Sequence, residues 1–85
     1  MIPSAIKEAI DQHVLTGQIC GSFTTAVLEN DLRGAVGHAD ETSFAHLHDI
    51  VSYCYNKIPG NCWGSKERVK EWREKGGDPD AYIEP

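Results

Sequence analysis

Two short segments pair a glycine with a serine just before a stretch that is predicted to be helical. They are Gly21-Ser22 and Gly64-Ser65. Glycine lets the backbone approach a ligand closely, serine offers a hydroxyl, and a helix start presents unpaired N–H groups with a partial positive charge. This combination suits a phosphate or a carboxylate. The same pair is also ordinary punctuation at a helix start, and both interpretations stay open here.

The second of these segments carries more chemistry than the first. Trp63 comes directly before it, and Lys66 and Arg68 follow it. An indole face can stack on a nucleotide base for about 1–3 kcal/mol, and the two cations favour a phosphate. If the Gly-Ser pair only starts a helix, Trp63 and Trp72 are instead expected in the core.

Asn30 and Asp31 interrupt the apolar surface of a helix predicted over residues 22–36. Polar groups on such a surface need partners. Either they satisfy backbone groups where helices cross, or they line a pocket and contact a ligand.

The three cysteines do not indicate a catalytic site. Cys20, Cys54 and Cys62 cannot all pair within one chain and form no C-x-x-C motif, so a reducing, cytosolic setting is expected. Cys54 falls on an apolar helix face, where a thiol usually serves as packing. No spacing selects a cysteine–histidine pair, so we predict no catalytic residue and no enzyme activity.

The histidines do not indicate a metal site either. His46 and His48 are two residues apart and point to opposite sides of a helix, and no other spacing in the chain is typical of zinc ligands. His13 lies on an apolar face and is expected to pack against the core. We predict no metal and no cofactor.

The elements that must position these residues are predicted to be helices. Apolar periodicity and end signals indicate an all-α fold, a small bundle of about four helices over residues 4–16, 22–36, 41–58 and 65–75. Residues 1–77 form one helical domain. Residues 78–85 form an irregular tail, in which Tyr82 and Ile83 could dock as an extended arm.

The helix over residues 44–58 is expected to be the centre of the core. Large side chains recur on it at intervals of three and four, so they share one stripe. They are Phe44, Leu47, Val51, Cys54, Tyr55 and Ile58. Replacing Leu47 or Val51 by alanine is therefore predicted to cost roughly 2–5 kcal/mol.

Composition excludes several classes of protein. With 8 Lys and Arg against 13 Asp and Glu the net charge is -5, so a protein that coats nucleic acid by neutralising phosphates is not expected. The basic residues concentrate in residues 65–75, whereas residues 1–64 are acidic. No apolar run approaches the roughly 18 residues of a membrane span, so no membrane association is expected.

Three segments resemble a family of small uncharacterised proteins encoded by bacteriophages and prophages. They are residues 21–32 (GSFTTAVLENDL), 35–40 (AVGHAD) and 55–65 (YNKIPGNCWGS), and the likeness spans about residues 3–75. The resemblance implies a phage accessory role in a bacterial cytoplasm. By analogy with other phage accessory proteins of this size, that role is to counter host defence.

The polar pieces of the resemblance would not be needed merely to fill a core, so the resemblance also implies a ligand pocket. The expected ligand-binding residues are Gly21, Ser22, Phe23, Asn30, Asp31, Tyr55, Asn56, Trp63, Gly64, Ser65, Lys66 and Arg68.

Two hypotheses for function follow. The first is a non-enzymatic binder of a phosphate-bearing small molecule, such as a nucleotide signal of host defence. The alternative is an inhibitor of a host protein that uses its acidic surface. The acidic residues in question are Glu29, Asp31, Asp40, Glu41 and Asp49.

A homodimer is also expected, because one small core has difficulty covering a two-sided second helix and both tryptophans. The contact surface would come from Phe23, Val27, Trp63 and Trp72, and a site at the boundary could combine Ser22 of one chain with Ser65 or Lys66 of another.

Overall fold

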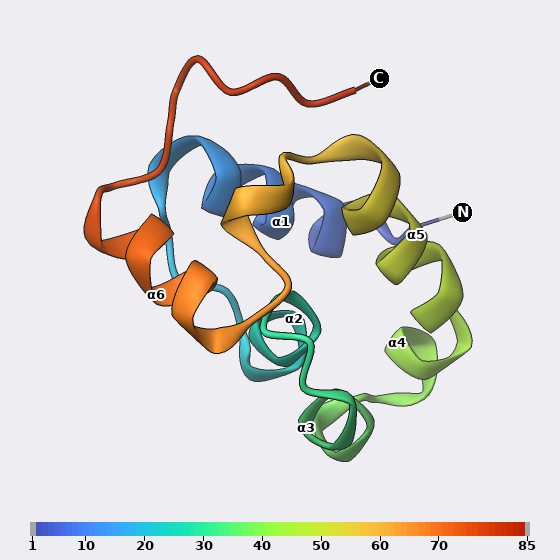
Figure 1. The fold of residues 1–85 in the computed structure, drawn as a ribbon. Helices are drawn as coiled ribbons and strands as arrows, with labels where there is room; N and C mark the ends of the chain where they lie inside the picture. Colours follow the sequence, from blue (N-terminus) through green and yellow to red (C-terminus); the bar gives the residue numbers. More distant parts are fainter. Residues whose placement is uncertain (1, 85) are drawn as a thin grey trace.

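Six α-helices and one 3-10 turn make up the regular structure, as seen in a computed structural model that describes residues 2–84 (Figure 1). The helices are α1 (Ser4–Thr16), α2 (Ser22–Leu28), α3 (Leu32–His38), α4 (Glu41–Ala45), α5 (Leu47–Lys57) and α6 (Lys66–Glu74), and the turn η1 is Gly60–Cys62. Residues 2–84 contain no strand. The predicted all-α fold is confirmed, but the count of four helices is not, because two predicted helices are each divided.

The helix predicted over residues 22–36 is divided at Asn30. Asn30 takes a left-handed conformation, with φ of 59°, and the carboxylate of Asp31 then accepts a hydrogen bond from the N–H of Gly34 at 3.0 Å. Asparagine tolerates this conformation better than most residues, and aspartate is a favoured N-cap. The pair therefore ends α2 and starts α3.

The helix predicted over residues 41–58 is divided at His46, which has φ of -107° and ψ of 14°. Its N–H is shared between the carbonyls of Thr42 and Ser43, at 3.2 and 3.3 Å. No glycine or proline marks this position, so the sequence pattern gave no signal for the break. The other predicted ends agree with the structure: Gly17 follows α1 in a left-handed conformation, and Ile58 before Pro59 is extended.

Serine side chains behave differently at the two Gly-Ser segments. The hydroxyl of Ser65 accepts a hydrogen bond from the N–H of Arg68 at 3.1 Å and caps α6. Ser22 is instead the first residue of α2, whose N-cap is Gly21 with no side-chain hydrogen bond. Of the two serines, only Ser65 therefore caps its helix through the side chain.

The core draws on every helix except α4 and lies around α1, α2, α5 and α6. The side chains with essentially no exposure are Ile10, His13, Val14, Leu28, Ile50, Cys54, Cys62 and Val69. Trp72 is also buried, and its indole N–H lies 3.0 Å from the carbonyl oxygens of both His13 and Val14. His13 is a core residue, as predicted, and its Nε2 donates to the Cys62 carbonyl oxygen at 2.9 Å.

The expected apolar stripe of residues 44–58 is only partly buried. Ile50, Tyr53 and Cys54 form the buried face of α5, and Ile58 is buried at its end. In contrast, Phe44, Val51 and Tyr55 are 58%, 41% and 78% exposed. Apolar residues thus cover more of the helix surface than a single stripe. The buried face of α5 is rotated about the helix axis from the expected face by roughly 100°, the angle between consecutive residues.

The C-terminal ends of α1 and α6 approach each other closely. Gly17 and Gly77 both have positive φ, and a Cβ built on Gly77 would lie 2.4 Å from the Gly17 backbone nitrogen. The N–H of Asp78 then donates to the Val14 carbonyl at 2.9 Å. Two glycines at this crossing therefore let the backbones touch.

The tail after α6 has no regular structure and crosses the top of the molecule in Figure 1. The N–H of Glu84 donates to the Lys57 carbonyl at 2.8 Å, and Ile83 packs against the core. Tyr82 is 72% exposed, so only Ile83 of the expected arm docks.

The contact surface expected for a dimer is largely covered within one chain. Phe23, Val27 and Trp72 are buried, and only Trp63 keeps partial exposure. The described chain therefore buries most of the expected contact surface, whereas Leu32, on the other side of the predicted second helix, is 72% exposed. The homodimer stays a prediction. No helix within residues 2–84 has the length and apolar character needed to cross a membrane.

Candidate functional site

The best equipped site surrounds Trp63, where three separate parts of the chain meet. These are the α2–α3 junction, the exposed side of α5, and the segment from η1 to the first turn of α6. They enclose an open hollow of about 320 Å³. We call it the Trp63 site, and it is lined by Asn30, Tyr55, Gly60, Trp63, Gly64 and Arg68.

Backbone hydrogen bonds fix the parts of this site relative to one another. The N–H of Gly64 donates to the Leu28 carbonyl at 2.7 Å, which ties the loop before α6 to the end of α2. The N–H of Asp31 donates to the Ala26 carbonyl at 2.8 Å and closes the turn at Asn30. Beneath the loop, the His13 ring holds the Cys62 carbonyl. The site is therefore built on an ordered backbone.

Gly64 has φ of 107°, in the region that favours glycine, and a Cβ there would lie 3.2 Å from Nη1 of Arg68. The same Nη1 donates to the Gly60 carbonyl at 3.3 Å. A guanidinium has five N–H donors, and this single long bond leaves several of them for a ligand. Gly64 thus fits the backbone beside Arg68 without displacing it.

A smaller, apolar hollow of about 70 Å³ adjoins the Trp63 site and shares Asn30 and Trp63 with it. Its other lining residues are Ala26, Val27, Asp31, Leu32, Ala35, Leu47 and Val51. Trp63 therefore lines both hollows.

Five of the residues predicted to bind a ligand come together at the Trp63 site: Asn30, Tyr55, Trp63, Gly64 and Arg68. Asp31 lines the adjoining hollow, and the Ser65 hydroxyl is engaged as the α6 cap. Lys66 is exposed and lines neither hollow.

The remaining predicted residues lie elsewhere. Ser22 lines a different hollow, whose ionisable side chains include the carboxylates of Glu29 and Asp31. Two carboxylates disfavour a phosphate there. Gly21 is exposed, and Phe23 is buried in the core. Asn56 bonds to Ser52 within α5 and lines a hollow with Asp49 and Lys57. Within one chain, the two Gly-Ser helix starts therefore do not share a site.

Gly60 belongs to the site but was not predicted. Nothing in the sequence signals that the Gly60 carbonyl accepts from Arg68.

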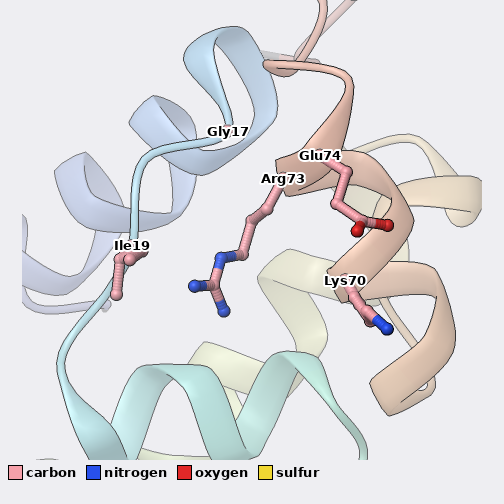
Figure 2. Close-up of a pocket in the computed structure, with 5 residues that line it drawn as sticks. All are labelled: Gly17, Ile19, Lys70, Arg73 and Glu74. Carbon is pink, nitrogen blue, oxygen red and sulfur yellow. The ribbon is translucent and has the colours of Figure 1, made fainter.

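Another hollow, of about 340 Å³, lies between the end of α1 and α6 (Figure 2). It is lined by Gly17, Ile19, Lys70, Arg73 and Glu74. Figure 2 shows the Arg73 side chain extending from α6 into the space beside Ile19, whereas Lys70 and Glu74 point away from it. The residues that line this hollow include two cations, Lys70 and Arg73, and no aromatic ring, so the hollow offers no surface on which a base could stack.

The thiols are poor nucleophiles. Burial raises the pKa of Cys20 to about 11, that of Cys54 to about 12 and that of Cys62 to about 11. All three are therefore protonated at neutral pH, and a thiolate is the reactive form. Within residues 2–84, no three His, Cys, Asp or Glu side chains are grouped in a way that could hold a metal ion.

Comparison with protein-family models, with curated proteins and with solved structures finds no match to this chain. The resemblance to phage proteins therefore stays a prediction from the three sequence segments, and arguments about function depend on the Trp63 site.

Proposed function

We propose that this protein is a small, non-enzymatic accessory protein of phage type that binds a phosphate-bearing small molecule with an aromatic base, a nucleotide signal, at the Trp63 site. The observation that carries the proposal is the convergence of Trp63, Tyr55, Arg68 and Asn30 on one hollow. Sequestering such a signal would counter a host defence that depends on it.

The aromatic residues account for binding of the base. Trp63 is partly buried and held by its loop, and Tyr55 is 78% exposed on α5. Stacking on an aromatic side chain contributes about 1–3 kcal/mol per base. A held ring loses less conformational entropy on binding than a free one, so Trp63 is the primary stacking surface.

Arg68 accounts for binding of the phosphate. Guanidinium groups pair with phosphate oxygens through two parallel N–H donors, and these charged hydrogen bonds are about twice as strong as neutral ones. The Asn30 side chain supplies both a donor and an acceptor at the same hollow, which suits the edge of a base. The three contacts together favour a nucleotide over a nucleoside or a free phosphate.

A thermal-shift screen followed by calorimetry tests this proposal. Cyclic and linear nucleotides are compared with nucleosides and with inorganic phosphate. We expect a nucleotide to raise the melting temperature and to bind with one site per chain, while the nucleoside and phosphate bind at least about tenfold more weakly.

Arg68→Gln is expected to weaken nucleotide binding by about tenfold or more, because it removes the charged contact. Arg73→Gln is the matched control, since Arg73 lies in the hollow of Figure 2 and should leave affinity within about twofold. A flat response to every nucleotide, or equal losses from both variants, would contradict the proposal.

A further inference from the structure

An apolar face lies on the side of α3, α4 and α5 that the core leaves uncovered. Leu32 and Val51 are 72% and 41% exposed, and together with the partly buried Leu47 they wall the apolar hollow of about 70 Å³. Val36 lies one helical turn after Leu32 on α3 at 46% exposure, and Phe44 is 58% exposed on α4, which joins α5 at His46. We call these five residues the apolar face.

This exposure is unusual for so small a protein. Single exposed apolar residues need no explanation, but a contiguous apolar surface bounded by polar residues marks an interaction site. The described part of the tail runs to the end of α5 and packs at Ile83, and no part of it lines the hollow. The described chain therefore leaves this face open.

The residues that begin α3 and α4 are acidic. Asp31 lines the hollow itself, Asp40 caps α4, and Glu41 opens that helix. Arg33 is the one Lys or Arg on α3 and α4, and His38 ends α3. A second copy of this chain docked face to face would bring these carboxylates against their own equivalents, which costs binding energy. A basic partner would instead be attracted.

We infer that the apolar face docks a basic amphipathic helix of another protein. The hollow is about half the volume of a cavity that accepts benzene, so it takes one aliphatic side chain. Apolar residues of the partner helix at intervals of three and four would lie between α3 and α5. Lysines or arginines flanking them would meet Asp31, Asp40 and Glu41. The hollow in this surface shares Asn30 and Trp63 with the Trp63 site, but Tyr55 and Arg68 do not line it.

The test uses a fluorescein-labelled peptide of leucine and lysine, about 18 residues long, whose leucines follow helical spacing. A peptide of the same composition in scrambled order and a peptide with glutamate for lysine are the controls. Fluorescence anisotropy is expected to show binding of the first peptide that weakens severalfold between about 50 and about 300 mM salt, and at least tenfold weaker binding of both controls.

Neutral substitutions locate the site without changing the charge. Leu32→Gln and Val51→Gln are each expected to weaken peptide binding by about tenfold. Ile19→Gln and Tyr82→Gln alter exposed apolar residues elsewhere, at 67% and 72% exposure, and should change it by less than about twofold. All four sites are exposed, and unchanged melting temperatures would verify that each variant folds.

Three outcomes would overturn the inference. The first is no binding of the basic peptide, and the second is an equal loss in Leu32→Gln and Ile19→Gln. The third is a particle of twice the 9.4 kDa chain mass in light scattering that Leu32→Gln returns to 9.4 kDa, which would assign the face to a second copy.

Discussion

Individual side chains decide which chemistry this protein can perform. Tyr55 of α5, Arg68 of α6 and Trp63 of the loop between η1 and α6 meet at one hollow with Asn30. The cysteines are the strongest nucleophiles in principle, but Cys54 and Cys62 are buried and Cys20 is partly buried. Cys62 donates its thiol hydrogen to the Pro59 carbonyl at 3.0 Å. The residues therefore favour binding over covalent catalysis.

Because of the buried thiols, the free energy of unfolding is expected to decrease at alkaline pH. An ordinary thiol has a pKa of 9.0, and burial raises that of Cys54 to about 12 in the folded protein. Between these values the unfolded chain loses the proton and the folded chain keeps it, so stability is complete below pH 9 and falls as pH rises above it. At pH 10 the loss from one such thiol is about 1 kcal/mol.

Urea denaturation at pH 7 and pH 10, with reductant present, measures this effect. Cys54→Val lacks the titrating group and keeps an apolar side chain, so its stability should fall by about 1 kcal/mol less than that of the wild type. An equal fall in both proteins would show that Cys54 does not carry the effect.

At the scale of elements, helix positions could be predicted but helix faces and breaks could not. Gly17, Asp40, Pro59 and Ser65 are local signals that act within one turn, and the structure agrees with them. The breaks at Asn30 and His46 depend on how consecutive helices pack. The buried side of α5 is set by contacts with residues that are distant in sequence. Because α5 carries apolar residues on both sides, its sequence alone does not determine which side is buried.

A matched pair of substitutions tests the corrected face of α5. Ile50 is fully buried, so Ile50→Ala should lower the free energy of unfolding by roughly 2–5 kcal/mol. Val51 is 41% exposed, and Val51→Ala should cost less than about 1 kcal/mol. The denaturation midpoints of the two variants are compared with that of the wild type. A larger loss in Val51→Ala would restore the face expected from the sequence and contradict the structure.

The candidate site was also only partly predictable, because some of its residues are neighbours in sequence and others are brought together by long-range contacts. The sequence segment from Trp63 to Arg68 carries an aromatic ring and two cations close together, so it could be recognised directly. That Asn30 and Tyr55 join it, and that Ser22 does not, depends on the bond between Gly64 and Leu28, which joins residues 36 positions apart. No local pattern predicts that bond.

At the scale of the whole molecule, the crossing of α1 and α6 closes the fold. Gly76 and Gly77 both have positive φ, but a Cβ on Gly76 would meet nothing within 4 Å, whereas a Cβ on Gly77 would lie 2.4 Å from the Gly17 nitrogen. Gly76→Ala should cost about 1–2 kcal/mol for the left-handed conformation alone. Gly77→Ala should cost clearly more, because the two backbones must also separate.

Thermal unfolding of the two alanine variants separates these costs. The difference between them reports the close approach, since the conformational term is common to both. Equal melting temperatures would mean that the α1–α6 crossing has room for a methyl group, contrary to the described packing.

The two tryptophans allow the central claim, ligand binding at the Trp63 site, to be tested in one spectrum. Trp72 is 4% exposed, and its indole N–H lies within hydrogen-bonding distance of the His13 and Val14 carbonyls, so its ¹⁵N–¹H signal is an internal control. Titration with cyclic and linear nucleotides is predicted to shift the indole signal of Trp63 and the side-chain amide of Asn30, while the Trp72 signal stays in place. If no nucleotide moves the Trp63 signal, or if the shifts gather around Ser22, the Trp63 site is not where this protein binds its ligand.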